Sequence, residues 1–333
     1  MRIVRRVSEK LTFHFDGALA DGHRMNFYES ARFQYAAARL MVKLAQFRRD
    51  GRFVQKITNN SNFDIQLVSQ KDGSFNINIE DAGQSSTEES FVKISLADLI
   101  AYVSERIIEK IDQTTLSEAA INNRSRLVSS KLADTNPAAA IDQLVEVALE
   151  DKELTSSLPS NVQDLIRRRV AESYREQRLS VNQGAISRID FARSQKLIAM
   201  SAPLISEMAT ALRKSATTLE VSSPAHDKDR SVLFLDRDMA REIETAIVDS
   251  DITPMLGDIT QFNKDNGWGK LKIDQGMKTI SFSIPYDILP SIRQKLIDNM
   301  KVDQVYLQTY FVRDRSGELI RLIAVGILPT PTI

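Results

Sequence analysis

Five strand-like runs in the last third of the chain constrain its fold more than any other feature. Short polar turns separate them, except that residues 286–300, with apolar side chains at helical spacing, lie between the third run and the fourth. This order predicts a small β-barrel with one helix inserted. The five runs are residues 255–263, 267–274, 279–284, 304–314 and 319–328.

A glycine-rich pattern surrounds Trp268, the only tryptophan of the chain, in the stretch GDITQFNKDNGWGKL. Residues 257–284 resemble the cold-shock domain, an OB-fold, which opens with a Phe-Asn pair, a short turn and a Gly-aromatic-Gly run. An OB-like barrel is therefore expected, and the order of the five runs agrees, because OB-folds usually place a helix between their third and fourth strands. An SH3-like barrel is the alternative. The matching residues are Gly257, Ile259, Phe262, Asn263, Gly267, Trp268, Gly269 and Leu271.

The same resemblance implies single-stranded nucleic-acid binding, because bases stack on exposed aromatic rings. Trp268 and Phe282 stand at stacking positions, whereas Gln261 replaces an expected tryptophan and Ile284 an expected histidine. From residue 251 onward, the chain has ten basic and nine acidic residues. Nucleic-acid binders typically have a clear excess of basic residues, and this part of the chain does not. The alternative is a barrel used for protein contact, with Trp268 packed against the turn between the strands. The candidate phosphate contacts are Lys264, Lys270 and Lys272.

The N-terminal part, residues 1–112, is expected to be an α+β domain. Alternating apolar residues predict a strand at 10–15, and an apolar stripe at spacings of three and four predicts a helix over 29–49. Further strand-like runs follow, and Asp72-Gly73 suits a hairpin turn between two of them. Ser95 is expected to cap a helix over 96–111, with Asp98 in its first turn. The three further runs are residues 52–57, 63–69 and 74–79.

Residues 113–220 are expected to be helical. Helices are predicted within residues 114–151, and another helix is predicted to begin at a cap formed by Ser160 or Asn161. A further helix is predicted from residue 189 to 219, and Pro203 within it predicts a kink or break. The Ser-, Pro- and charge-rich residues 221–230 are expected to be a linker, and 231–333 the barrel domain. The fold class is therefore α+β in three parts.

Composition limits the classes of function. The chain has 333 residues, equal numbers of basic and acidic residues (44 each) and no cysteine, which excludes disulfides and thiolate sites. Without an apolar run long enough for a membrane span, a soluble cytoplasmic protein is expected. The sequence has no phosphate loop, nucleophile elbow or dinucleotide fingerprint, so no cofactor is predicted.

One polar cluster near the N-terminus is a candidate metal site. His14 and Asp16 alternate onto one face of the first strand, and Asp21 and His23 follow a glycine-containing loop. Two imidazoles and two carboxylates suit a divalent cation, so a metal-dependent enzyme is one hypothesis. The alternative is that these side chains bond loop amides.

The leading interpretation is a non-catalytic interaction or assembly protein that associates with itself or with a partner protein through amphipathic helices. Single-stranded nucleic-acid or nucleotide binding by the barrel is the alternative. The run DGSFNINI, from residue 72, also resembles the N-terminal region of uncharacterised bacterial proteins of phage-defence neighbourhoods. That resemblance implies a subunit of a multi-protein defence system.

Overall fold

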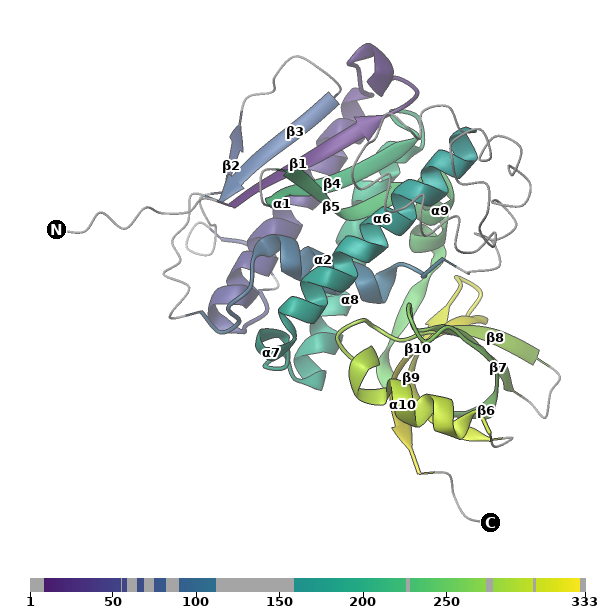
Figure 1. Ribbon diagram of the computed structural model, residues 1–333. Helices are drawn as coiled ribbons and strands as arrows, with labels where there is room; N and C mark the ends of the chain where they lie inside the picture. Colours follow the sequence, from purple (N-terminus) through teal and green to yellow (C-terminus); the bar gives the residue numbers. More distant parts are fainter. Residues whose placement is uncertain are drawn as a thin grey trace.

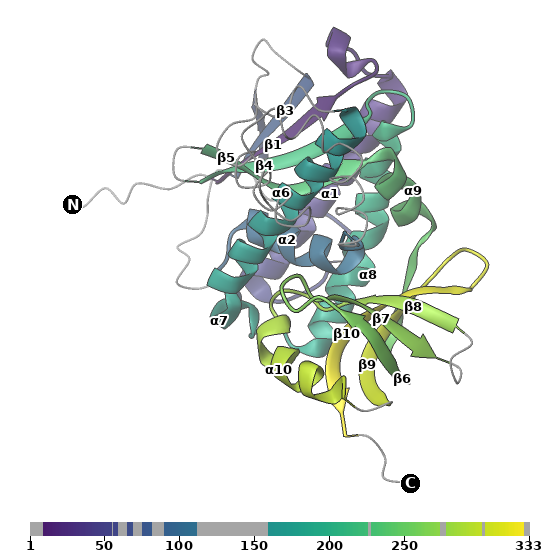
Figure 2. The same ribbon diagram turned by 45° about the vertical axis from the view of Figure 1, so that its right-hand side comes forward.

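The computed structural model describes residues 9–54, 56–58, 65–68, 75–81, 90–111, 159–225, 228–273, 278–301 and 304–329. The fold is α+β, as expected, and has two parts: a sheet with its helices, which we call the body, and a closed β-barrel (Figures 1 and 2). The helices predicted within 114–151 and the turn at Asp72-Gly73 lie outside the described residues.

An antiparallel sheet forms the core of the body, in the order β2-β3-β1-β4-β5. The central strand is β1, whose Leu11, Phe13 and Phe15 are buried while the residues between them are not, which confirms the predicted alternation. The strands are β1 (Glu9–Asp16), β2 (Ile65–Val68), β3 (Phe75–Asp81), β4 (Thr218–Ala225) and β5 (Lys228–Asp236). Described residues of 52–57, also strand-like in sequence, form no strand.

The prediction of a linker at 221–230 is wrong. Residues 221–225 belong to β4 and residues 228–230 to β5, the two strands pair with each other, and Val221 of β4 pairs with Phe13 of β1 in the centre of the sheet. Ladder hydrogen bonds use the backbone, so Ser222 and Ser223 can form a strand although their side chains are typical of linkers. The body therefore combines strands from both ends of the first 236 residues.

Six α-helices of the described chain belong to the body. The expected stripe of α1 is buried, and α1 packs along α8, while α6 packs against α2 and β5. Ser95 caps the start of α2, as predicted, and Asp98 forms a capping box with it. The helices are α1 (Phe27–Asp50), α2 (Leu96–Ile107), α6 (Ser160–Val181), α7 (Gln183–Ile186), α8 (Phe191–Ala209) and α9 (Arg237–Thr245).

The predictions for helices α6 and α8 need correction. The N-cap of α6 is Pro159, not Ser160 or Asn161, and no side chain caps it. Helix α8 continues through Pro203, so of the predicted kink or break the break is wrong. Proline removes one backbone donor, but Leu204 and Ile205 are buried next to it, and their packing holds the helix together. The prediction also extended this helix to residue 219, which lies in β4.

The C-terminal strands close into a barrel in the order β10-β8-β7-β6-β9. All neighbours are antiparallel except β8 and β10. Helix α10 (Leu289–Asn299) lies between the third and fourth strands, as predicted. The strands are β6 (Ile247–Phe262), β7 (Trp268–Ile273), β8 (Lys278–Ser283), β9 (Val305–Arg313) and β10 (Leu319–Leu328).

Candidate functional site at the junction of body and barrel

The glycines of the stretch 257–271 are explained by the closure of the barrel. A Cβ on Gly269 would lie 2.3 Å from a ring atom of Phe282, and a Cβ on Gly257 would lie 2.7 Å from the carbonyl oxygen of Lys272. Gly267 has a φ of +73°, which glycine adopts without strain. The glycines at these positions therefore permit close approach between strands. Barrel closure alone accounts for the glycine pattern, without a bound ligand.

The two candidate stacking rings lie inside the protein. Trp268 is 5% exposed and Phe282 is 1% exposed. Phe282 stacks on Phe262 with 6.2 Å between ring centroids. Of the candidate lysines, Lys264 and Lys272 are exposed, and the ammonium group of Lys270 lies 5.4 Å from the centre of the Trp268 ring. The structure thus brings Trp268 and Lys270 together. The rings of Trp268 and Phe282 are both buried, so neither is presented to a base.

The four candidate metal ligands are not gathered around one point. Asp16 and Asp21 both accept a hydrogen bond from the backbone N–H of Gly17, at 3.1 and 2.7 Å. Asp16 also pairs with Arg167 at 3.1 Å. In the described ranges no group of three or more metal-ligating side chains is placed to hold an ion. The geometry of Asp16 and Asp21 matches the alternative of bonds to loop amides.

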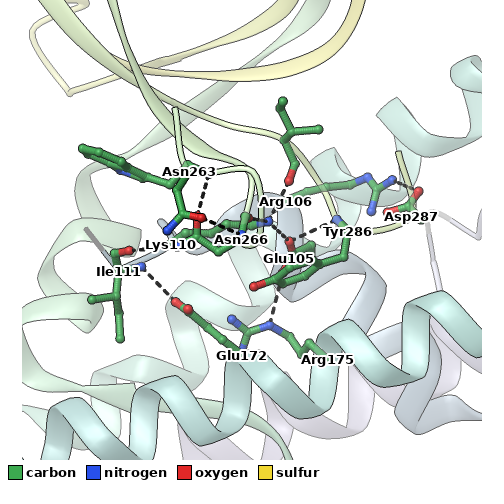
Figure 3. A network of polar contacts seen from close by, with 12 residues as sticks. Glu105, Arg106, Lys110, Ile111, Glu172, Arg175, Asn263, Asn266, Tyr286 and Asp287 are labelled. Carbon is green, nitrogen blue, oxygen red and sulfur yellow. Dashed lines mark hydrogen bonds and ion pairs between the residues drawn. The ribbon is translucent and has the colours of Figure 1, made fainter. Parts of the chain in front are cut away.

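The turn before Trp268 contacts the body (Figure 3). Lys110 Nζ, just beyond α2, donates to the carbonyl oxygens of Asn266 at 2.5 Å and Ile284 at 2.6 Å. Asn266 Nδ2 in turn donates to the carbonyl oxygen of Ile111 at 3.4 Å. A stretch that resembles a nucleic-acid signature is therefore a docking element within the chain.

Buried charges surround this contact. Lys110 Nζ lies 2.8 Å from Glu105 Oε1, and Arg175 Nε lies 3.4 Å from Glu105 Oε2. Figure 3 shows Glu172 and Arg175 reaching from one helix toward this group, and Glu172 accepts from the backbone N–H of Ile111 at 2.9 Å. Burial lowers the pKa of Lys110, while the Glu105 carboxylate opposes this effect. These charges are enclosed and paired with one another, and Lys110 among them bonds the barrel through Asn266 and Ile284.

A second ion pair extends the junction. Arg106 Nη2 lies 2.6 Å from Asp287 Oδ2, and its guanidinium lies 3.6 Å from the centre of the Tyr102 ring. Burial alone would lower the pKa of Arg106, but the interactions with Asp287 and Tyr102 outweigh the effect of burial and raise this pKa. The pair joins α2 to the segment between β8 and α10, so it adds a further link between the barrel and the body.

A pocket of about 330 Å³ opens beside this ion pair. Tyr102 and Phe191 line it from the body, and Asp287 and Tyr310 line it from the barrel part of the chain. Phe191 and Tyr310 stack with their ring centroids 5.5 Å apart. Asp287 Oδ1 and Tyr310 Oη are buried and have no hydrogen-bond partner among the described residues. The pocket therefore contains polar groups whose hydrogen-bonding capacity is unused.

The outer face of α1 is the other unusual surface. Phe27, Tyr28 and Tyr35 are 89%, 68% and 62% exposed. Arg32 lies 5.7 Å from the ring centre of Tyr28, and Arg39 lies 5.3 Å from that of Tyr35. Sequence reasoning used only the buried stripe of this helix and missed its outer side. The signal was present, because these aromatics fall outside the apolar stripe.

Neither protein-family models, curated proteins nor solved structures gave a match to this chain. Within the described ranges, no helix combines the length and the apolar character that crossing a membrane requires.

Proposed function

We propose that this chain is a non-catalytic interaction protein that associates with a second copy of itself through the outer face of α1. The observation that supports it is the heptad spacing of exposed residues on that face. Tyr28 and Tyr35 alternate with Ala31 and Ala38 at steps of three and four. Large aromatic side chains exposed in this way are typical of helix interfaces.

An antiparallel arrangement makes the face complementary to itself. When two antiparallel copies are related by a twofold axis level with position 33, whose own side chain faces the core, Tyr28 of one copy lies opposite Ala38 of the other, and Tyr35 lies opposite Ala31. Each large side chain then meets a small one, so the two helices can approach closely. This size complementarity favours a second copy over an unrelated partner.

Charge does not oppose this contact. From Phe27 to Ala38 no exposed residue of the helix is charged. The half-buried Arg32 pairs with Glu207 of the same chain at 3.3 Å. Arg39 would lie near Phe27 of the second copy, where a cation favours an aromatic ring. The exposed part of α1 is short, so we expect a dissociation constant in the micromolar range.

Analytical ultracentrifugation of the full chain over a concentration series tests the proposal. The native protein should sediment as a dimer at tens of micromolar, and Tyr35→Glu should sediment as a monomer with an unchanged circular-dichroism spectrum. Val181→Glu is the matched control, because it places the same charge at an exposed apolar position of another helix, α6. A native monomer at about 100 μM, or a dimer in Tyr35→Glu, would refute the proposal.

A further inference from the structure

The pocket at the junction has the composition of a small-molecule site. Its volume, about 330 Å³, is at the lower end of the range for ligand pockets. It lies between two parts of the fold, where such sites are common. A larger groove of about 610 Å³ lies beside Asp98 and Arg178, but those charges already pair at 2.8 Å.

Two polar atoms in the smaller pocket lack partners among the described residues. Asp287 uses Oδ2 to bind Arg106, while its Oδ1 is buried and unpaired. Tyr310, 2% exposed, has an unpaired hydroxyl group. An unsatisfied buried polar atom destabilises a fold, so a pair of them in one pocket points to a ligand that supplies the missing hydrogen bonds.

The arrangement of charge and rings defines the ligand. The ligand must donate a hydrogen bond to the Asp287 carboxylate and accept a hydrogen bond from the Tyr310 hydroxyl group. The charge of Asp287 is already balanced by Arg106 at 2.6 Å, so the pocket favours neither an anion nor a cation. Phe191, Tyr102 and Ile288 supply aromatic and apolar walls. We propose that this pocket binds a net-neutral aromatic molecule with an amide-like pair of N–H donor and oxygen or nitrogen acceptor.

Three probes of similar shape test this chemistry on the full chain. Benzamide is neutral and carries both a donor and an acceptor, benzoate is its anionic counterpart and benzamidine its cationic one. In ligand-observed NMR titrations, benzamide should bind with a millimolar dissociation constant, as expected for a molecule of so few atoms. It should bind at least about fivefold more tightly than either ion, because each ion faces a like charge in the pocket.

Tyr310→Phe separates ligand binding from folding. The substitution keeps the ring stacked on Phe191 and removes only the unpaired hydroxyl group. Benzamide should then bind about three- to tenfold more weakly, the value of one hydrogen bond, while the melting temperature stays the same or rises. Tyr306→Phe is the control, since it makes the same change on β9 outside the pocket lining and should leave benzamide affinity unchanged.

Three results would overturn the proposal. They are the absence of benzamide binding up to about 20 mM, binding of benzoate or benzamidine as tight as that of benzamide, and unchanged benzamide affinity in Tyr310→Phe. None of them bears on the α1 face, which lies on another part of the chain and is tested by sedimentation.

Discussion

The ammonium group of Lys110 donates a 2.6 Å hydrogen bond to the carbonyl oxygen of Ile284, the residue that follows barrel strand β8. The two residues are 174 positions apart in the sequence. The same ammonium group lies 3.5 Å from the centre of the Tyr286 ring. One buried cation thus joins the end of α2 to the barrel, which makes the junction sensitive to its removal.

Replacing Lys110 with methionine should destabilise the protein by about 3–5 kcal/mol, because it leaves Glu105 with one cation fewer in a solvent-excluded site. The two carbonyl oxygens that Lys110 bonds also lose their donor. Guanidinium unfolding measures the loss. Lys272→Met, on an exposed position of β7, should change stability by less than about 0.5 kcal/mol. Equal stabilities of the two variants would show that the network does not hold the barrel.

Gly269→Ala should destabilise the barrel by about 1–3 kcal/mol, because the added Cβ has no space. It would lie 2.3 Å from Phe282 and 2.6 Å from the carbonyl oxygen of Gln261. Gly184→Ala, in helix α7, is the control: its Cβ meets nothing within 4 Å, so stability should rise by about 0.4–1 kcal/mol. Urea unfolding of both variants measures the difference. A stable Gly269→Ala would mean that the pattern around Trp268 has another cause.

The barrel could be predicted because its strands follow local rules. Alternation of apolar residues, polar turns and the helix at 289–299 are all visible within short windows of sequence. The pairing of β4 with β5 and β1 could not be, because residues 221–230 have the composition of a linker and the partner strand β1 lies near the start of the chain. Local composition cannot show which distant strand a segment pairs with.

The junction lay beyond sequence reasoning for a related reason. Nothing around Lys110 distinguishes it from a solvent-exposed lysine at the end of a helix, and Asn266 looks like an ordinary turn residue. They become important only when the barrel docks on the body. The pocket at Asp287 and Tyr310 has the same origin, since its walls come from segments that are distant in the sequence.

Trp268 provides a test of nucleic-acid binding by the barrel. Because the ring is 5% exposed, single-stranded oligonucleotides should not quench its fluorescence, even at low salt where phosphate contacts are strongest. The single tryptophan makes the signal unambiguous. Acrylamide should quench it weakly in the native protein and strongly in urea, which confirms burial in solution. Saturable quenching by an oligonucleotide would instead show that the ring becomes accessible and stacks on bases.

Glu242 in α9 should make stability fall as the pH rises above about 4.5. Burial raises the pKa of its carboxyl group, an effect that Arg321, 3.4 Å away, opposes and Glu109 reinforces. The native state therefore holds this proton at a pH where the unfolded chain has lost it. The stabilisation is complete below the unfolded pKa and disappears as the pH rises through the native pKa.

Glu242→Gln removes this titration and isolates its effect from other ionisable groups. The free energy of unfolding of the native protein minus that of Glu242→Gln should decline as the pH rises above about 4.5, and then level off once the carboxyl group is ionised in both states. Urea unfolding at a series of pH values from about 4 to 8 measures the difference. A difference that stays constant or grows with pH would mean that Arg321 outweighs burial and that the carboxylate is stabilised in the folded protein.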